Sequence, residues 1–215
     1  SALRFAQPVT RPMSPLLEAS SLSCAFDAID RPLGAFRAAA RASGASINDV
    51  FVTGVCRGLA RWHDAHGLHQ SHLRMGTAIS VRGATGDRGA FAPSPGANQF
   101  VPTRFEVPLV AGGPDAHLAT IRALLRAQRD EPALALVEPL TAVARRLPRP
   151  VLVRLLGGLL RGQDFVASNV AGAPVPIYFA GAQVTDVLAF GPLGGTALNL
   201  TLLSHDGTAH IGVTR

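Results

Sequence analysis

The stretch ALNLTLLSHDGTAHIGV, residues 197–213, decides the class of fold. Asp206-Gly207 in this stretch is a dipeptide typical of type I′ turns, which join two antiparallel strands. The apolar runs on either side of it, 196–203 and 208–213, therefore predict a β-hairpin. Three further apolar runs upstream predict more strands: 165–170, 176–179 and 182–189. The last third of the chain is expected to form a largely antiparallel sheet.

The chain begins with a segment of another character. Residues 1–24 are rich in Pro and Ser and predict an extended lead-in, which a short strand at 25–30 follows. Asp30 is expected to cap a helix that has Pro32 in its first turn, because proline fits there without losing a hydrogen bond. Gly44 is expected to end this helix.

A second helix is the clearest helical pattern in the sequence. Ser46, followed three residues later by Asp49, predicts a capping box at its start, and the helix is expected to end near Gly67. One apolar face repeats at the helical spacing of 3.6 residues. It consists of Ile47, Val50, Phe51, Val55, Leu59 and Trp62.

Two strands and a third long helix fill the middle of the chain. Strands are expected at 73–82 and 98–109, with a Gly/Pro/Ala-rich loop at 83–97 between them. A helix is expected from Asp115 to about Arg129, and prolines divide the residues from there to about 160 into short helices. Helices that precede a sheet in this way predict a layered α/β architecture.

Composition limits the classes of partner. All 20 basic residues are arginine and the net charge is +6, which favours anionic lipid surfaces or acidic ligands such as CoA phosphates. Aromatic residues make up only 6% and do not cluster with the arginines, so nucleic acid is not an expected partner. Cys24 and Cys56 form no disulfide framework, which favours a reducing cytoplasm, and Cys56 is expected to be buried.

Four histidines close together raise the question of a metal site. They are His63, His66, His69 and His72, with Asp64 beside the first. Gly67 should break the helix between them, and no cysteine or second carboxylate lies near in the sequence. We therefore expect an exposed helix end with a polar linker and no metal site.

Three polar positions remain as candidates for function. Asn48-Asp49 is expected to serve a local role at the positive start of a helix. Ser168-Asn169 either forms a turn or is a polar strand end that lines a cleft, and both readings stay open. Asn199 lies within an apolar run, so it is either a buried structural clamp or a polar group that faces a site.

Arginines among leucines and valines mark residues 140–161. They are Arg145, Arg146, Arg149, Arg154 and Arg161. They predict either the solvated face of short helices or a surface that docks on lipid, where arginines meet headgroups and leucines meet acyl chains.

Taken in order, eight segments resemble one family, the bacterial wax ester synthase/diacylglycerol acyltransferases. The resemblance covers about residues 30 to 213. The segments are Ser46 to Phe51 (SINDVF), Ala78 to Arg82 (AISVR), Gly96 to Asn98 (GAN), Asp115 to Ile121 (DAHLATI), Ser168 to Pro174 (SNVAGAP), Ile177 to Ala182 (IYFAGA), Ala197 to Leu200 (ALNL) and Ser204 to Gly207 (SHDG).

The resemblance implies a fold and an activity. It implies a chloramphenicol acetyltransferase-like lobe over residues 25–215, with a mixed, largely antiparallel sheet and flanking helices. It also implies acyl transfer from acyl-CoA, as a substrate, to a fatty alcohol or diacylglycerol, with no cofactor. Asn48-Asp49 would order a helix near the interface of two lobes, Ser168-Asn169 would line the cleft, and Asn199 would hold the central strand.

The sequence also departs from the family. The catalytic sequence of the family, His-His-x-x-x-Asp-Gly, belongs to its N-terminal lobe and occurs nowhere in this chain. The implied partner is therefore an N-terminal lobe that supplies the catalytic histidine. A cleaved enzyme whose pieces stay associated is expected, rather than a lobe that works alone. Ala171 and Ala173 replace two prolines of the family motif after Ser168.

Two alternatives differ from this interpretation. The chain could be a non-catalytic lobe that binds a lipid surface or a partner, or one half of a condensation-type acyltransferase that takes its donor from a carrier protein. The expected location is the cytoplasm, either free or peripheral at a membrane or lipid inclusion.

Overall fold

The computed structural model describes residues 11–18, 23–80, 100–130, 148–151 and 162–215. The helices are a 3-10 turn, η2 (Pro15–Leu17), and the α-helices α1 (Leu33–Ser43), α2 (Ile47–Ala65) and α3 (Pro114–Arg129). The strands are β1 (Phe26–Pro32), β2 (His72–Ser80), β3 (Phe100–Pro108), β4 (Phe165–Ala171), β5 (Ile177–Phe179), β6 (Ala182–Val184), β7 (Leu198–His205) and β8 (Thr208–Thr214).

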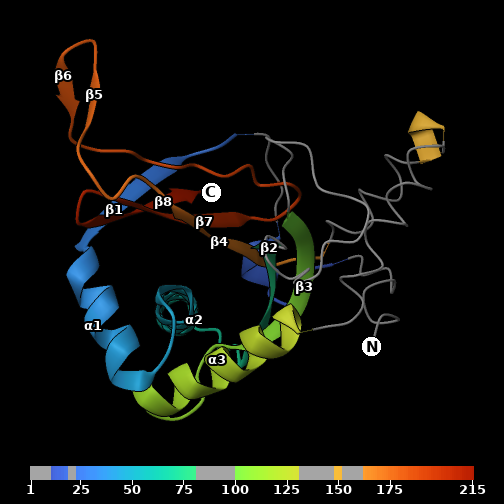
Figure 1. Cartoon of the computed structure of the whole chain (residues 1–215). Coiled ribbons are helices and arrows are strands. Elements are labelled where there is room, and N and C mark those ends of the chain that lie inside the picture. The colour runs from blue at the N-terminus through green and yellow to red at the C-terminus, as the bar shows by residue number, and fades with distance from the viewer. Residues whose placement is uncertain (1–10, 19–22, 81–99, 131–147, 152–161) are drawn as a thin grey trace, which may run out of the picture.

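Six strands form one mixed sheet in the order β1-β8-β7-β4-β2-β3. The pairs β4–β7 and β2–β4 are parallel and the other three pairs are antiparallel. The three α-helices lie together on one side of this sheet, and the hairpin β5–β6 projects from it as a separate two-stranded unit (Figure 1). The predicted class, an α/β lobe with a largely antiparallel sheet and flanking helices, is confirmed.

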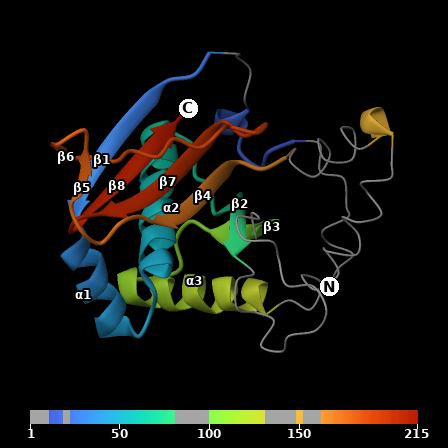
Figure 2. The ribbon, with the colours of Figure 1, turned by 45° about the horizontal axis from the view of Figure 1, so that its top comes forward.

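The core lies between the sheet and helix α2, which crosses behind the central strands (Figure 2). Successive side chains of a strand point to opposite faces, so Leu198, Leu200 and Leu202 of β7 face the helices. Of the predicted apolar face of α2, Phe51 and Leu59 are buried in this core, whereas Trp62 near the end of the helix is 38% exposed, so the prediction was wrong for Trp62. Cys56 of the same helix is fully buried, as expected, and burial raises the pKa of its thiol to about 12.

The turn and cap signals predicted several element ends. Asp206 and Gly207 have φ angles of 40° and 83°, which fits the type I′ turn between β7 and β8. Gly44 ends α1 in the left-handed conformation with φ 61°, and Ser46 and Asp49 form the predicted capping box. These three predictions are confirmed. Each concerns a hydrogen bond or a positive φ angle that depends on residues adjacent in the sequence.

Asp30 does not cap α1, so that prediction was wrong. Strand β1 continues to Pro32, which precedes α1 without a side-chain cap. The carboxylate of Asp30 instead accepts a hydrogen bond from His210 Nδ1, its register partner on β8, at 2.7 Å. A contact between residues 180 positions apart has no signature in local sequence.

Two further boundaries differ from the predictions. Strand β6 ends at Val184 rather than at 189, and the chain then crosses the sheet without joining its ladder. The predicted lead-in contains η2, and Leu17 of that turn lies in the core. The predicted loop at 83–97 and most of the predicted short helices before 160 lie outside the described residues.

Candidate functional site

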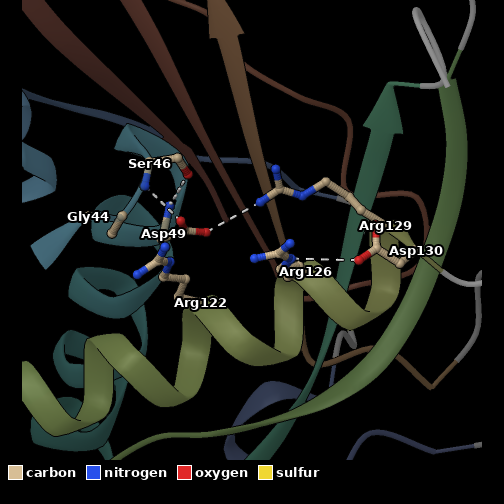
Figure 3. Close-up of a pocket in the computed structure, with 8 residues that line it drawn as sticks. Gly44, Ser46, Asp49, Arg122, Arg126, Arg129 and Asp130 are labelled. Carbon is tan, nitrogen blue, oxygen red and sulfur yellow. Dashed lines mark hydrogen bonds and ion pairs between the residues drawn. The ribbon is translucent and has the colours of Figure 1, made fainter. Parts of the chain in front are cut away.

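Asp49 is a buried residue that joins α2 to α3. Its Oδ2 accepts a hydrogen bond from the Ser46 backbone N–H at 2.7 Å, and its own N–H donates to Ser46 Oγ at 3.1 Å. Its Oδ1 lies 3.5 Å from Nη2 of Arg129 on α3 (Figure 3). The carboxylate therefore satisfies the start of α2 and joins that start to the end of α3.

An open hollow of about 390 Å³ lies beside this carboxylate. Arg122 on its wall donates from Nη1 to the carbonyl of Ser43 at 3.2 Å, and Gly44 lies against the same guanidinium. The residues that line the hollow are Gly44, Ala45, Ser46, Asp49, Arg122, Arg126, Arg129 and Asp130 (Figure 3). The arginines bind carbonyl or carboxylate groups. These contacts connect the end of α1, the start of α2 and the end of α3.

Asn48 precedes Asp49 in the first turn of α2 and is half-buried. The two residues thus lie in the helical layer. The local role that the sequence predicts for Asp49, at the positive start of a helix, is what its contacts show.

Ser168 and Asn169 occupy the middle of β4, toward the end that is open to solvent. Ser168 is half-buried and pairs in register with Thr201 of β7. Asn169 is exposed, and the next residue, Val170, is 44% exposed. Of the two readings, the structure places the pair within a strand rather than in a turn.

Asn199 is a buried clamp on the sheet face opposite the helices. Its Nδ2 donates to the carbonyl of Pro192 at 2.9 Å, and its Oδ1 accepts from Thr201 Oγ1 at 3.0 Å. A side chain on Gly191 would overlap the Asn199 amide, so the chain passes this point as glycine. Asn199 therefore fixes residues 191 and 192 onto β7.

The five candidate residues do not form one site. Ser168 and Asn199 point to the same face of the sheet. Ser168 is the register partner of Thr201, and Asn199 lies two residues from Thr201 on β7. Asn48 and Asp49 lie in the helical layer beyond the opposite face. These candidates thus occupy two separated polar places, and none of the five is a base paired with a nucleophile.

A buried polar cluster that the sequence did not predict ties the lead-in to the sheet. Asp164 accepts backbone hydrogen bonds from Ser14 at 2.9 Å and from Arg74 at 2.6 Å. Burial raises the pKa of Asp164, and those backbone donors partly oppose the shift. Ser14 Oγ also lies 2.8 Å from His63 Nε2.

His63 contradicts the expected exposed helix end, because it is fully buried. Its Nδ1 lies 2.7 Å from the carbonyl of Leu59, so its Nε2 accepts the Ser14 hydroxyl hydrogen bond. This hydroxyl–imidazole pair has no exposed surface, and its contacts are those of a structural lock. His66, His69 and His72 are exposed and bind separate neighbours, so they do not converge with His63.

An exposed apolar hairpin is the second feature that the sequence did not reveal. Tyr178 and Phe179 of β5 are 64% and 78% exposed, and Ile177 beside them is 39% exposed. All three residues were expected in a strand, but a strand pattern does not say whether another surface covers it.

No helix among the described residues has both the length and the hydropathy needed to cross a membrane.

Comparison with known proteins places this fold. Residues 97–215 match the family model described as the WS/DGAT C-terminal domain. Two proteins of Mycobacterium tuberculosis, from strains CDC 1551 and H37Rv, carry the provisional name diacylglycerol O-acyltransferase. Each is 36% identical to the chain over 213 residues. That alignment takes in 99% of this chain and 42% of each relative, so the chain spans less than half the length of these proteins.

Solved structures share the same architecture. The wax ester synthase/diacylglycerol acyltransferase from Marinobacter aquaeolei VT8 is 19% identical, with a TM-score of 0.58 over 99% of this chain and 48% of that chain. The starter condensation domain of rhizomide synthetase RzmA is 14% identical, with a TM-score of 0.54 over 99% and 43%. The fold is thus the chloramphenicol acetyltransferase-like fold that these proteins share. The family model and the mycobacterial relatives together show that this chain belongs to the wax ester synthase/diacylglycerol acyltransferase family, in which it corresponds to the C-terminal domain.

Proposed function

We propose that the chain forms the C-terminal lobe of an O-acyltransferase, which moves an acyl group from acyl-CoA to a fatty alcohol or diacylglycerol. Membership of the family supports the reaction class. The relatives extend over more than twice the aligned length, and the sequence lacks His-His-x-x-x-Asp-Gly, so the catalytic histidine belongs to an N-terminal lobe. The chain by itself is inactive.

The observation that carries the need for a partner lobe is the bare apolar hairpin β5–β6. Large apolar side chains cluster along this hairpin and the strand end next to it: Val170, Val175, Ile177, Tyr178 and Phe179. Exposed apolar groups that cluster on one projection mark an interaction surface. The N-terminal lobe is the partner that covers the hairpin.

The residues of this lobe shape the cleft and leave the proton transfer to the partner. The histidine of the N-terminal lobe takes the proton of the acceptor hydroxyl, the oxygen attacks the thioester carbonyl, and the CoA thiolate leaves and is protonated. Such general-base help is worth roughly 10²–10⁴-fold. The part of β4 that carries Ser168 and Asn169 forms part of the cleft wall, Asn199 holds the central strand, and Asn48-Asp49 orders α2 near the interface. The reaction needs no cofactor.

An activity assay with both lobes tests this proposal. The chain is mixed with a polypeptide from the same source that carries His-His-x-x-x-Asp-Gly, and acyl transfer from labelled acyl-CoA is measured with a fatty alcohol and with a diglyceride. We expect transfer only when both lobes are present. Donors bound to a carrier protein are run in parallel, and turnover restricted to them would show a condensation-type enzyme instead.

Substitutions in the hairpin distinguish docking from catalysis. Phe179→Ser removes an exposed aromatic side chain without opening the core, so it should weaken association of the lobes and lower turnover at limiting concentration. Val110→Ser is the matched control, because Val110 is 52% exposed and lies after β3, away from the hairpin. Equal activity of both variants would contradict the docking role.

The alternative role, a lobe that binds a lipid surface, has its own result. In flotation with anionic vesicles, salt-sensitive binding of the chain without turnover in the two-lobe assay would favour that role. Binding together with turnover supports an acyltransferase that is peripheral at a cytoplasmic membrane or lipid inclusion.

A further inference from the structure

A segment that follows β6 crosses the sheet face opposite the helices. We call residues 185–192 the strap. Val184, just before it, accepts a hydrogen bond from His205 Nε2 at 3.2 Å, and the carbonyl of Ala189 lies directly over Gly212 of β8. At its far end the strap is held by Asn199. The strap is therefore a separate layer of a few residues on β7 and β8.

The strap brings one carboxylate to an imidazole–carboxylate pair on the sheet. Asp30 of β1 and His210 of β8 are direct register partners, with Oδ1 and Nδ1 at 2.7 Å. Asp186 of the strap supplies the third group, and one ligand atom from each of the three residues lies within 4.8 Å of the others. Three segments that are distant in sequence thus converge on one point.

The donor groups at this point are two carboxylates and one imidazole, all of which can bind a cation. In the described part of the chain, no arginine pairs with the carboxylate of either Asp30 or Asp186. Arg31 bonds only to the backbone carbonyl of Asp30, at 2.7 Å, and Thr185 Oγ1 donates to Asp186 at 2.8 Å. Two neighbouring carboxylates repel each other, and a cation bound between them removes that repulsion.

The imidazole of His210 is buried, and Nδ1 is the nitrogen that meets Asp30. Its side chain is 1% exposed, and its Nε2 has no hydrogen-bond partner among the described residues. Among the described residues, Asp30 alone bonds the ring, and Nδ1 rather than Nε2 is the nitrogen that faces the cluster.

We propose that Asp30, Asp186 and His210 form a binding site for a divalent transition-metal cation, which fastens the strap to the β1–β8 edge. Metal–nitrogen and metal–oxygen bonds of about 2.0–2.2 Å put a nitrogen and an oxygen ligand roughly 3–3.4 Å apart. A small widening of the present Nδ1–Oδ1 distance makes that room, and the Nδ1 proton leaves to solvent when the metal binds. Water fills the remaining positions.

The donor set selects the class of metal. One imidazole nitrogen with two carboxylates suits Zn²⁺ or Mn²⁺, whereas Mg²⁺ and Ca²⁺ prefer oxygen ligands alone. The site does not depend on the acyl transfer that we propose, because it lies in this chain only and its test measures binding rather than turnover.

Equilibrium dialysis of the 215-residue chain against ZnCl₂, with metal analysis, tests the site. We expect one Zn²⁺ per chain and an affinity that falls at least tenfold in Asp186→Asn, a change at an exposed position that keeps the side-chain shape. Asp115→Asn, at an exposed carboxylate on α3, is the matched control and should stay within about twofold of the wild type. Zn²⁺ should also raise the melting temperature of the wild type and not that of Asp186→Asn.

The rival site is the exposed group around Asp64 and His69, which a His69→Ala variant removes. Absence of saturable Zn²⁺ binding, unchanged affinity in both Asp186→Asn and Asp30→Asn, or a loss seen only in His69→Ala would each overturn the proposal. Visible absorption of bound Co²⁺ that disappears in Asp186→Asn would support it by a readout that does not rest on stability.

Discussion

Asp49 makes one contact with a neighbour in the sequence and one with a residue far along the chain. Its contact with Ser46 follows from a spacing of three residues and was predicted from sequence. Its contact with Arg129 joins residues 80 positions apart and was not. The carboxylate of Asp49 therefore connects the start of α2 to the end of α3.

Removal of the Asp49 carboxylate should destabilise the fold. In Asp49→Ala the Ser46 N–H and the Arg129 guanidinium both lose their acceptor, so we expect a loss of about 1–2 kcal/mol in the free energy of unfolding. Urea denaturation measures this loss. Ser43→Ala, which removes a hydroxyl bonded only to the carbonyls of its own helix, is the control and should change stability by less than about 0.5 kcal/mol. Equal effects of the two variants would contradict this role of Asp49.

At the scale of elements, the strap depends on glycine at one position of β8. A Cβ on Gly212 would collide with the backbone carbonyl of Ala189, and that backbone cannot turn aside as a side chain can. We expect Gly212→Ala to destabilise the chain by about 1–3 kcal/mol, as overpacking does. Gly58→Ala on α2, where nothing lies within 4 Å, should instead be neutral or stabilising. A thermal melt that finds Gly212→Ala as stable as wild type would contradict a closely packed strap.

Helix α3 meets the sheet through a buried histidine whose protonation should matter. Burial lowers the pKa of His117, a hydrogen bond to the Pro108 carbonyl partly opposes that shift, and the charge of Arg57 adds to it. The folded state therefore binds fewer protons than the unfolded chain, whose histidine pKa is about 6.5. Stability from this residue is present above that pKa and is lost as pH falls below it.

His117→Gln should flatten this pH dependence, because an amide still donates to Pro108 and does not titrate. Urea denaturation at about pH 7 and pH 5 measures the difference, which should shrink in the variant. His66→Gln is the control, since His66 is exposed at the end of α2 and should leave the difference unchanged. A pH dependence that is the same in wild type and His117→Gln would show that this histidine is not the cause.

The elements that sequence predicted well are those set by neighbours in the chain. The hairpin at Asp206-Gly207, the cap at Ser46 and the stop at Gly44 each depend on a few adjacent residues. The sequence predicts a helix cap at Asp30, because a cap needs only neighbouring residues. In the structure the carboxylate of Asp30 instead binds His210, which lies 180 positions away. Burial of His63 under Ser14 and the course of the strap also depend on distant contacts, which a single sequence does not contain.

The whole molecule is a lobe with two unlike faces and a bare projection. Helices cover one face of the sheet, the strap crosses the other, and the apolar hairpin β5–β6 stands away from both (Figures 1 and 2). The candidate residues Ser168 and Asn199 belong to the strap face, whereas Asn48 and Asp49 belong to the helical side. Such an arrangement fits a wall of a two-lobed enzyme better than a complete active site.

Native mass spectrometry of material purified from the source, followed by denaturation, tests this account most directly. The account predicts a particle heavier than the 22.4 kDa of this chain that contains His-His-x-x-x-Asp-Gly, on the same polypeptide or on a second one. A lone species of 22.4 kDa that no further polypeptide accompanies would contradict the two-lobed acyltransferase.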